Sequence, residues 1–398
     1  MIPVRNEEDL LPNALHALAE QQCADGSPFA HSAYEIVLLI NNSVDRSAQV
    51  ARHFARLYPS LRLHVVERDL RPGTAHIGYV RRLLMDEACR RARASHVSDA
   101  LMLSTDADTQ VAPNWIAANL AELCAGADVV GGRILINGDE IATLSTAAGT
   151  RLKLDRLYRR LVSWIESQLD PEMHDPWPRH PHHFGASLAI WPHVYERVGG
   201  VPPRRHLEDI AFYRALLRHD IRIKHSMKVR VMTSARLIGR ARYGLSKTLS
   251  DWCESGPRGV NSLVESKAFL EFLFGTRRQL RSVWLEQKYD RHVAEAEIHS
   301  LAAAMDCSYS TLWNHIRNAA SFGSLLEDIR FYALCRSAWP DWKRLQGLQR
   351  VVEDLLKSFL CERGRAVAVV ASTRHNASAN GHSASTQFVT EANPLARA

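Results

Sequence analysis

The chain has 398 residues, and its content of 46% hydrophobic and 23% charged residues is typical of a soluble globular protein with two or three domains. A net charge of +7 suits anionic partners such as nucleotide diphosphates, acidic lipids or nucleic acid, without choosing among them. No apolar run approaches the ~20 residues of a membrane span, so we expect no transmembrane segment and at most peripheral contact with a membrane.

The cysteines indicate a cellular compartment. Seven are scattered along the chain, and no two have CxxC spacing. An odd number without that spacing argues against a disulfide framework or a zinc ribbon and favours a reducing environment. With no signal-peptide pattern visible either, we expect a cytoplasmic protein.

Strand and helix patterns alternate over the first 135 residues. Helical spacing of apolar residues predicts helices, and short apolar runs predict strands. The expected strands are 34–40, 61–65, 100–104 and 127–130, and the expected helices are 7–22, 50–57, 75–94 and 113–124. This alternation predicts an α/β fold with a largely parallel sheet, in which ligands bind beyond the carboxyl ends of the strands.

The first residues form an unusually short strand pattern. Met1–Val4 has too few apolar residues for a full central strand before the polar loop at 5–8. We therefore hypothesise that the natural chain begins upstream of Met1.

The second half of the chain changes character. We expect a helix at 144–169, a loop rich in Pro and His at 170–183, a strand at 185–190, helices at 192–198 and 210–217, and a strand at 221–231. Helices dominate from about 246 to 360, and the tail from 372 has a composition typical of disorder. These patterns predict three parts: a catalytic domain at 1–245, a helical domain at 246–370 and a disordered tail at 371–398.

The strongest chemical signal is Asp106-Ala-Asp108, directly after the expected strand at 100–104. In an extended loop, side chains two residues apart face the same way, so both carboxylates can bind one Mg²⁺ or Mn²⁺ ion. A polar turn without function explains the pair equally simply. A haloacid-dehalogenase-like phosphatase is a further alternative, disfavoured because the motif does not follow the first strand and Gln110 stands where that class has Thr or Val.

Three more polar loops follow strands or open helices, where a helix N-terminus suits phosphate groups. Taken singly, each is more often a solvated loop with a helix cap. They contain Pro3, Arg5, Asn6 and Glu7, then Asn41, Ser43 and Asp45, and then Gly73 and Arg81.

In this order, the motifs resemble those of the family-2 glycosyltransferases, which adopt the GT-A fold. Gly185–Ile190, Gly199-Gly200 and Glu208-Asp209 extend the resemblance to about residue 240. It implies a Rossmann-like sheet flanked by helices, and transfer of a sugar, usually with inversion, from a nucleoside-diphosphate sugar to a hydroxyl of a glycan, lipid or small-molecule acceptor.

The resemblance also implies roles for single residues. Asp209 becomes the general base with Glu208 beside it, and Asp106 and Asp108 become the ligands of Mg²⁺ or Mn²⁺. The nucleotide sugar contacts Pro3, Arg5, Asn6, Glu7, Asn41, Asp45, Gly73, Arg81 and Asp106. The family's histidine after the Glu-Asp pair is absent, and Arg236 is a candidate phosphate clamp in that region.

Three alternatives remain. A nucleotidyltransferase or pyrophosphorylase uses a related fold, but the loop at 5–8 lacks the expected glycine. Residues 297–316 are similar to a helix-turn-helix and allow a DNA-binding regulator. We favour a packed helical hairpin that binds no nucleic acid, because basic residues are sparse on the second helix. The histidines at 174–183 have no usual zinc spacing, and Pro176, Trp177 and Pro178 in the same loop look more like a lid over the acceptor site.

Overall fold

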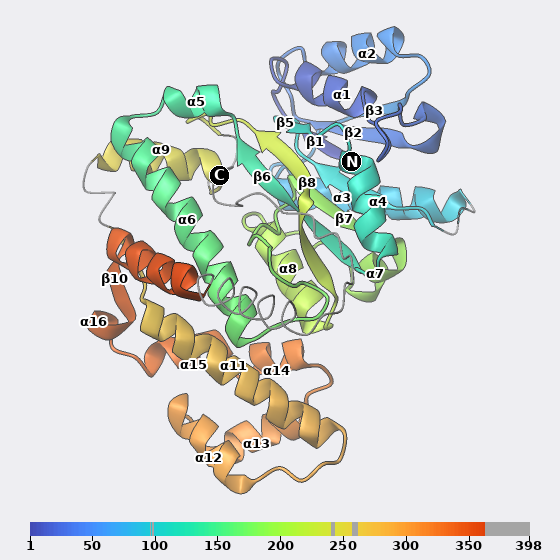
Figure 1. The fold of residues 1–398 in the computed structure, drawn as a ribbon. Coiled ribbons are helices and arrows are strands. Elements are labelled where there is room, and N and C mark those ends of the chain that lie inside the picture. Colours follow the sequence, from blue (N-terminus) through green and yellow to red (C-terminus); the bar gives the residue numbers. More distant parts are fainter. Residues whose placement is uncertain (96, 98, 240–242, 257–261, 363–398) are drawn as a thin grey trace, which may run out of the picture.

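The computed structural model describes the whole chain except residues 96, 98, 240–242, 257–261 and 363–398, so the predicted disordered tail lies outside the described residues. Figure 1 shows an α/β part, in which helices flank the strands, and a helical part below it. No described helix is both long and apolar enough to cross a membrane.

The first three strands form the parallel sheet that the sequence predicted. They are β1 (Ile2–Val4), β2 (Glu35–Asn41) and β3 (Arg62–Arg68), with β2 in the middle. The apolar run in β2 is buried on both faces. Val37 and Leu39 pack with residues of α3 (Ile77–Ala94), whereas Leu38 and Ile40 pack into the core beneath α1 (Leu11–Ala19) and α2 (Ser47–Leu57). A strand covered by helices on both faces has this continuous apolar pattern.

The second sheet is mixed rather than largely parallel. Its five strands lie in the order β4 (Met102–Thr105), β7 (Ser187–Ile190), β6 (Val129–Ile136), β8 (Ile223–Thr233) and β5 (Thr109–Val111). Only β6 and β8 pair in parallel, and the other three pairings are antiparallel. The backbone of Met1 bonds to Leu103 and Thr105, so β1 and β4 join the two sheets edge to edge.

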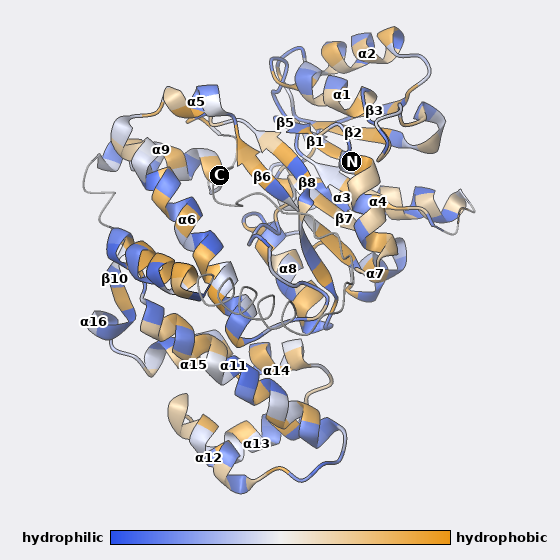
Figure 2. Ribbon diagram, viewed as in Figure 1, coloured by the Kyte–Doolittle hydropathy of each residue, from blue (hydrophilic) through white to orange (hydrophobic). Residues whose placement is uncertain are grey.

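Helices cover both faces of the sheets. One core lies beneath α1 (Leu11–Ala19), α2 (Ser47–Leu57) and α4 (Trp115–Cys124). Others lie beneath α3 (Ile77–Ala94), α7 (Pro192–Arg197) and α8 (Glu208–Arg218). A short 3₁₀ helix spans His31–Ala33, and α5 spans Gly138–Ala142. Figure 2 shows apolar residues concentrated along the central strands and on one side of most helices.

The helical part begins at α6 (Thr146–Leu169), whose Leu161, Trp164 and Ile165 belong to its core. Its other helices are α9 (Leu245–Ser255), α11 (Lys267–Lys288), α12 (Glu295–Ala304), α13 (Tyr309–Asn318), α14 (Phe322–Asp328), α15 (Phe331–Ser337), α16 (Asp341–Arg344) and a helix over 348–362. β9 (Leu263–Glu265) and β10 (Leu345–Gly347) form a small antiparallel pair within it.

Candidate active site

Two loops at the carboxyl ends of β1 and β2 are held together by side-chain to backbone hydrogen bonds. The Glu7 amide donates to Ser47 Oγ at 2.8 Å, and the Glu8 amide donates to Asp45 Oδ2 at 3.0 Å. Asn6, with a left-handed φ of 53°, accepts from the Val44 amide. Asp45 also accepts from the amide and hydroxyl of Ser47, and these bonds outweigh partial burial and lower the pKa of its carboxyl. The predicted nucleotide residues Asn6, Glu7 and Asp45 therefore lie together.

The other predicted nucleotide residues of this region are placed differently. Asn41 is buried at the end of β2, and Pro3 lies within β1. Arg5 is exposed, and Gly73 lies on an exposed turn in which the amides of Thr74 and Ala75 donate to the Arg71 carbonyl. The structure brings Pro3 and Asn41 to neighbouring strands, but it shows no direct contact between Gly73 and the acidic residues described next.

Three acidic residues and Arg236 form one charge cluster. Asp106 and Asp108 lie in the turn between β4 and β5. Arg236 makes two hydrogen bonds to the Glu7 carboxylate, at 2.7 and 2.8 Å, and an ion pair with Asp108 at 2.7 Å. Arg236, in the segment after β8, thereby contacts both Glu7 in the loop after β1 and the predicted metal ligand Asp108.

The environment of Asp108 favours its neutral form. Burial raises the pKa of its carboxyl to about 6, with further contributions from Asp106 and Glu7, even though Arg236 opposes the shift. One guanidinium shared with Glu7 does not balance this concentration of negative charge. Such a site gains from a further cation.

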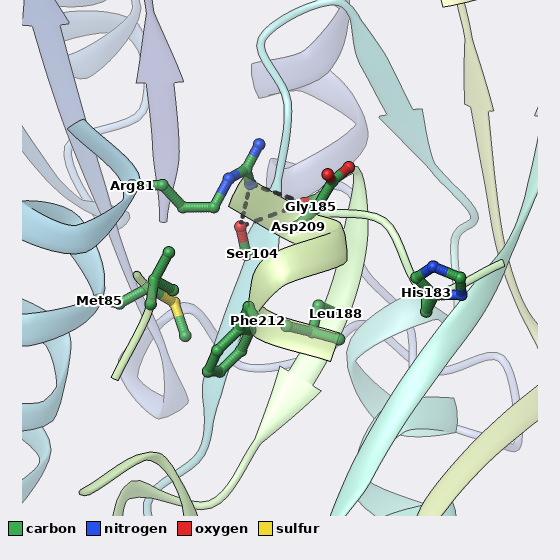
Figure 3. A pocket seen from close by; sticks show the side chains of 9 residues that line it. Arg81, Met85, Ser104, His183, Gly185, Leu188, Asp209 and Phe212 are labelled. Carbon is green, nitrogen blue, oxygen red and sulfur yellow. Dashed lines mark hydrogen bonds between the residues drawn. The ribbon is translucent and has the colours of Figure 1, made fainter. Parts of the chain in front are cut away.

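Arg81 occupies the centre of the site (Figure 3). It is buried and donates to Asp106 at 3.0 Å, to Glu208 at 3.3 Å, to Ser104 at 2.9 Å and to the Gly185 carbonyl at 3.1 Å. Its pKa is raised because the charges of Asp106 and Glu208 outweigh burial. A Cβ at Gly185 would lie 2.1 Å from the guanidinium, so a larger residue there would displace Arg81 from these partners. Arg81 therefore connects the Asp106 turn to the Glu208-Asp209 pair.

Glu208 and Asp209 begin α8 but differ in their surroundings. Glu208 is buried against Arg81, and burial raises the pKa of its carboxyl. Asp209 instead lines a small pocket with His183, Arg81 and Phe212 (Figure 3). One Asp209 oxygen accepts from the Ile210 amide at 2.8 Å, in the first turn of the helix. Of the two carboxylates, Asp209 is the one that faces the pocket.

Sequence analysis included Gly185 in the family resemblance and His183 in the candidate lid loop without giving either a role in the site, and it did not single out Ser104. Ser104 stands immediately before the acidic motif, which was the available signal. His183 stacks on Tyr213 with ring centroids 3.8 Å apart, a contact formed between a loop and α8 that no local pattern encodes. The predicted lid residue Trp177 packs near Phe359 of the helical core instead of over the pocket.

Comparison with known proteins agrees with this arrangement. Residues 1–169 match the family model described as Glycosyl transferase family 2. The comparison with curated proteins finds no match. A mannosyltransferase, PcManGT from Pyrobaculum calidifontis, solved with GDP-Man and Mn²⁺, is similar over 85% of this chain and 84% of its own, with 15% identity and a TM-score of 0.40. That TM-score is too low to carry any argument about this chain.

The fold and the motifs thus define a glycosyltransferase with a GT-A fold. Residues 1–169 are therefore a glycosyl transferase family 2 domain.

Proposed function

We propose that the protein transfers a sugar from a nucleoside-diphosphate sugar to an acceptor hydroxyl with inversion, in the cytoplasm. The observation that carries this proposal is a pair of contact chains that meet at the turn 106–108: Arg236 joins Glu7 to Asp108, and Arg81 joins Asp106 to Glu208, the neighbour of Asp209. Together they join a predicted nucleotide side to a predicted acceptor side. Seven free thiols support the reducing compartment.

The residues of the acidic turn fit a bound Mg²⁺ or Mn²⁺ ion. Among the described residues, no group of three or more His, Cys, Asp or Glu is arranged to hold a metal, so Asp106 and Asp108 would share the ion with the diphosphate. The raised pKa of Asp108 and the buried Thr105 hydroxyl without a hydrogen-bond partner indicate a polar site that needs another group. When bound, the metal supplies positive charge to the leaving diphosphate.

The chain's own residues have separate tasks in this mechanism. Asp209, at the positive end of α8, accepts the proton of the attacking hydroxyl at a carboxylate oxygen. Arg81 fixes the distance between the Asp106 turn and α8, and Arg236 holds Asp108 and the Glu7 loop in place. The second candidate, a nucleotidyltransferase, gains no specific support from this geometry.

A binding screen of nucleoside diphosphates and nucleotide sugars, with and without Mn²⁺, tests the proposal. We expect Mn²⁺ to strengthen binding to the wild type, and Asp108→Asn to remove this gain while the protein stays folded, because one of two ligand carboxylates is lost. The control Asp25→Asn changes an exposed loop carboxylate and should behave as wild type. Equal Mn²⁺-dependent affinity in Asp108→Asn would contradict the metal assignment.

A further inference from the structure

Three arginines gather on the sheet face opposite the first core, where β6 and β8 pair. Arg133 on β6 is directly opposite Arg230 on β8 in the parallel register. Their neighbours Ile134 and Val231 point into the core beneath α1 and α2, so both arginines project from the other face. Like charges directly opposite on adjacent strands destabilise a sheet, and a pair in this position calls for an explanation.

Arg156 on α6 completes the cluster. Burial lowers the pKa of Arg156, and the nearby charge of Arg133 lowers it further. Burial and Arg230 lower the pKa of Arg133 in the same way. Unlike Arg159, which pairs with Asp155 at 2.7 Å, these three form no ion pair with any carboxylate in the part of the chain that the structure describes. The cluster therefore holds about three positive charges that repel one another.

This arginine cluster (Arg133, Arg156 and Arg230) adjoins the candidate active site. The Ile134 amide donates to His182 Nδ1 at 2.9 Å, and a Cβ on Gly131 would lie 2.6 Å from the His182 carbonyl. His182 belongs to the loop before β7, and this loop lies against β6. The same loop continues directly to His183 and Gly185, which line the pocket with Asp209. The cluster thus lies beside the loop that leads to the Asp209 pocket.

We propose that Arg133, Arg156 and Arg230 bind a phosphate group carried by the acceptor. This rests on the proposed function and adds the substrate class. A phosphate monoester carries about −1.5 to −2 charge at neutral pH and three acceptor oxygens, which matches several guanidinium groups better than a single carboxylate does. His182 contributes as a neutral donor: burial and the nearby arginines lower its pKa to about 3, and its Nδ1 already accepts, which leaves the proton on Nε2.

Binding of inorganic pyrophosphate in EDTA, followed by thermal unfolding, tests the site without metal, donor or turnover. We expect pyrophosphate to raise the Tm of the wild type. In the double variant Arg133→Gln/Arg156→Gln the affinity should fall about 10-fold or more, the usual effect of losing charged hydrogen bonds. Without ligand, this variant should be as stable as the wild type or more stable, because repulsion is relieved. The control Lys153→Gln removes an exposed charge from the same helix and should change neither value.

The outcomes separate the possibilities. No rise in the wild-type Tm, or an undiminished rise in the double variant, overturns the proposal. If the double variant does not fold, the two single variants replace it, and each should weaken pyrophosphate binding. Phosphorylated lipid-like and phosphorylated sugar acceptors then distinguish the source of the phosphate. Mn²⁺-dependent nucleotide affinity should stay unchanged in all variants. Its loss in the arginine variants would mean that the cluster binds the donor diphosphate and would overturn this site, whereas its absence from the wild type would count against the proposed function.

Discussion

Adjacent carboxylates at the start of α8 have distinct surroundings, which separates two roles at the scale of single residues. Glu208 is buried and bonded to Arg81, whereas Asp209 lines the pocket. A buried carboxylate that holds an arginine acts through that arginine, whereas the base proposed here must itself contact the acceptor. Asp209 and Glu208 therefore should not respond alike to the same conservative change from carboxylate to amide.

We expect Asp209→Asn to lower kcat by about 10²–10⁴-fold, the usual contribution of a general base, with nucleotide affinity nearly unchanged. Glu208→Gln should instead weaken donor binding and lower the Tm, because Arg81 loses a charged partner in a buried site. Transfer rates, nucleotide affinity and Tm of both variants measure the difference. Near-normal turnover in Asp209→Asn would show that Asp209 is not the general base.

The sequence identified most of the charged residues but not their pairing. Asp106, Asp108 and Glu208 were recognisable because each stands after a strand or at a helix start, and Arg81 because the family resemblance includes the segment from Gly73 to Arg81. That Arg81 would bind Glu208, 127 positions away, and that Arg236 would bind Glu7, 229 positions away, depends on how the sheets assemble. Local patterns carry no information about such long-range partners, so the network became visible only in the structure.

At the scale of elements, α3 is fixed by a close contact near its start. A Cβ at Gly78 would lie 2.0 Å from the Arg204 carbonyl oxygen, a backbone atom that cannot swing aside. We expect Gly78→Ala to destabilise the protein by about 1–3 kcal/mol through overpacking. Nucleotide binding should weaken as well, because the change displaces Arg81, which lies about one helical turn further along α3. Gly275→Ala is the matched control: nothing lies within 4 Å of its Cβ in α11, so it should stabilise by about 0.5–1 kcal/mol. Chemical denaturation measures the change in the free energy of unfolding of each variant. A change of the same sign in both variants would contradict the close contact at Gly78.

The pair α12 and α13 explains the helix-turn-helix pattern without DNA. Leu301, Met305, Leu312 and Ile316 are buried in the helical core, which accounts for their spacing. We expect no sequence-selective DNA binding, and any non-specific binding should fade steeply as salt rises. Electrophoretic mobility shifts at 50 and 200 mM salt, about the range over which such binding is lost, check this. Salt-resistant retention of one DNA fragment would reverse the interpretation.

Element boundaries were predicted well where periodicity was long and poorly where strands were short. The helix expected at 144–169 is α6, Thr146–Leu169. In contrast, β5 has only three residues and was not predicted, since its pairing with β8 is what makes it a strand. The mixed second sheet follows from the same long-range pairings, because a strand's direction depends on the path of the chain between strands.

For the molecule as a whole, a buried ion network ties the two parts together. Arg277 on α11 binds Asp170 and Glu166 at the end of α6, and Arg179 of the following loop binds Glu166 at 2.8 Å. Asp175 of the same loop also contacts His225 on β8, at 2.7 Å. The helical part therefore supports the loop that leads to His183 and Gly185, although α11 itself lies far from Asp106 along the chain.

The predicted boundary at residue 245 divides this supported assembly. Leu161, Trp164 and Ile165 of α6 are buried by the helical part, so a fragment ending at 245 would expose them. We expect that fragment to aggregate, and the full chain to lose its site and its helical core in one transition. Separate transitions for nucleotide binding and for helix content would contradict a shared core.

Arg277→Ala tests the network in the full chain. It leaves the buried carboxylate of Asp170, only 2% exposed, with Arg281 as its remaining guanidinium partner. Breaking a buried ion pair from one side costs about 3–5 kcal/mol when the remaining charge is left uncompensated, and we expect the lower end of this range because Arg281 still pairs with Asp170. Transfer activity should fall together with stability, since the loop toward His183 loses its support. The adjacent control Arg278→Ala removes an exposed side chain with a single 3.5 Å contact to the Leu169 carbonyl and should change stability by no more than about 0.5 kcal/mol. If both variants unfold at the same denaturant concentration as wild type, the ion network does not join the two parts, and packing of α6 on α11 alone must do so.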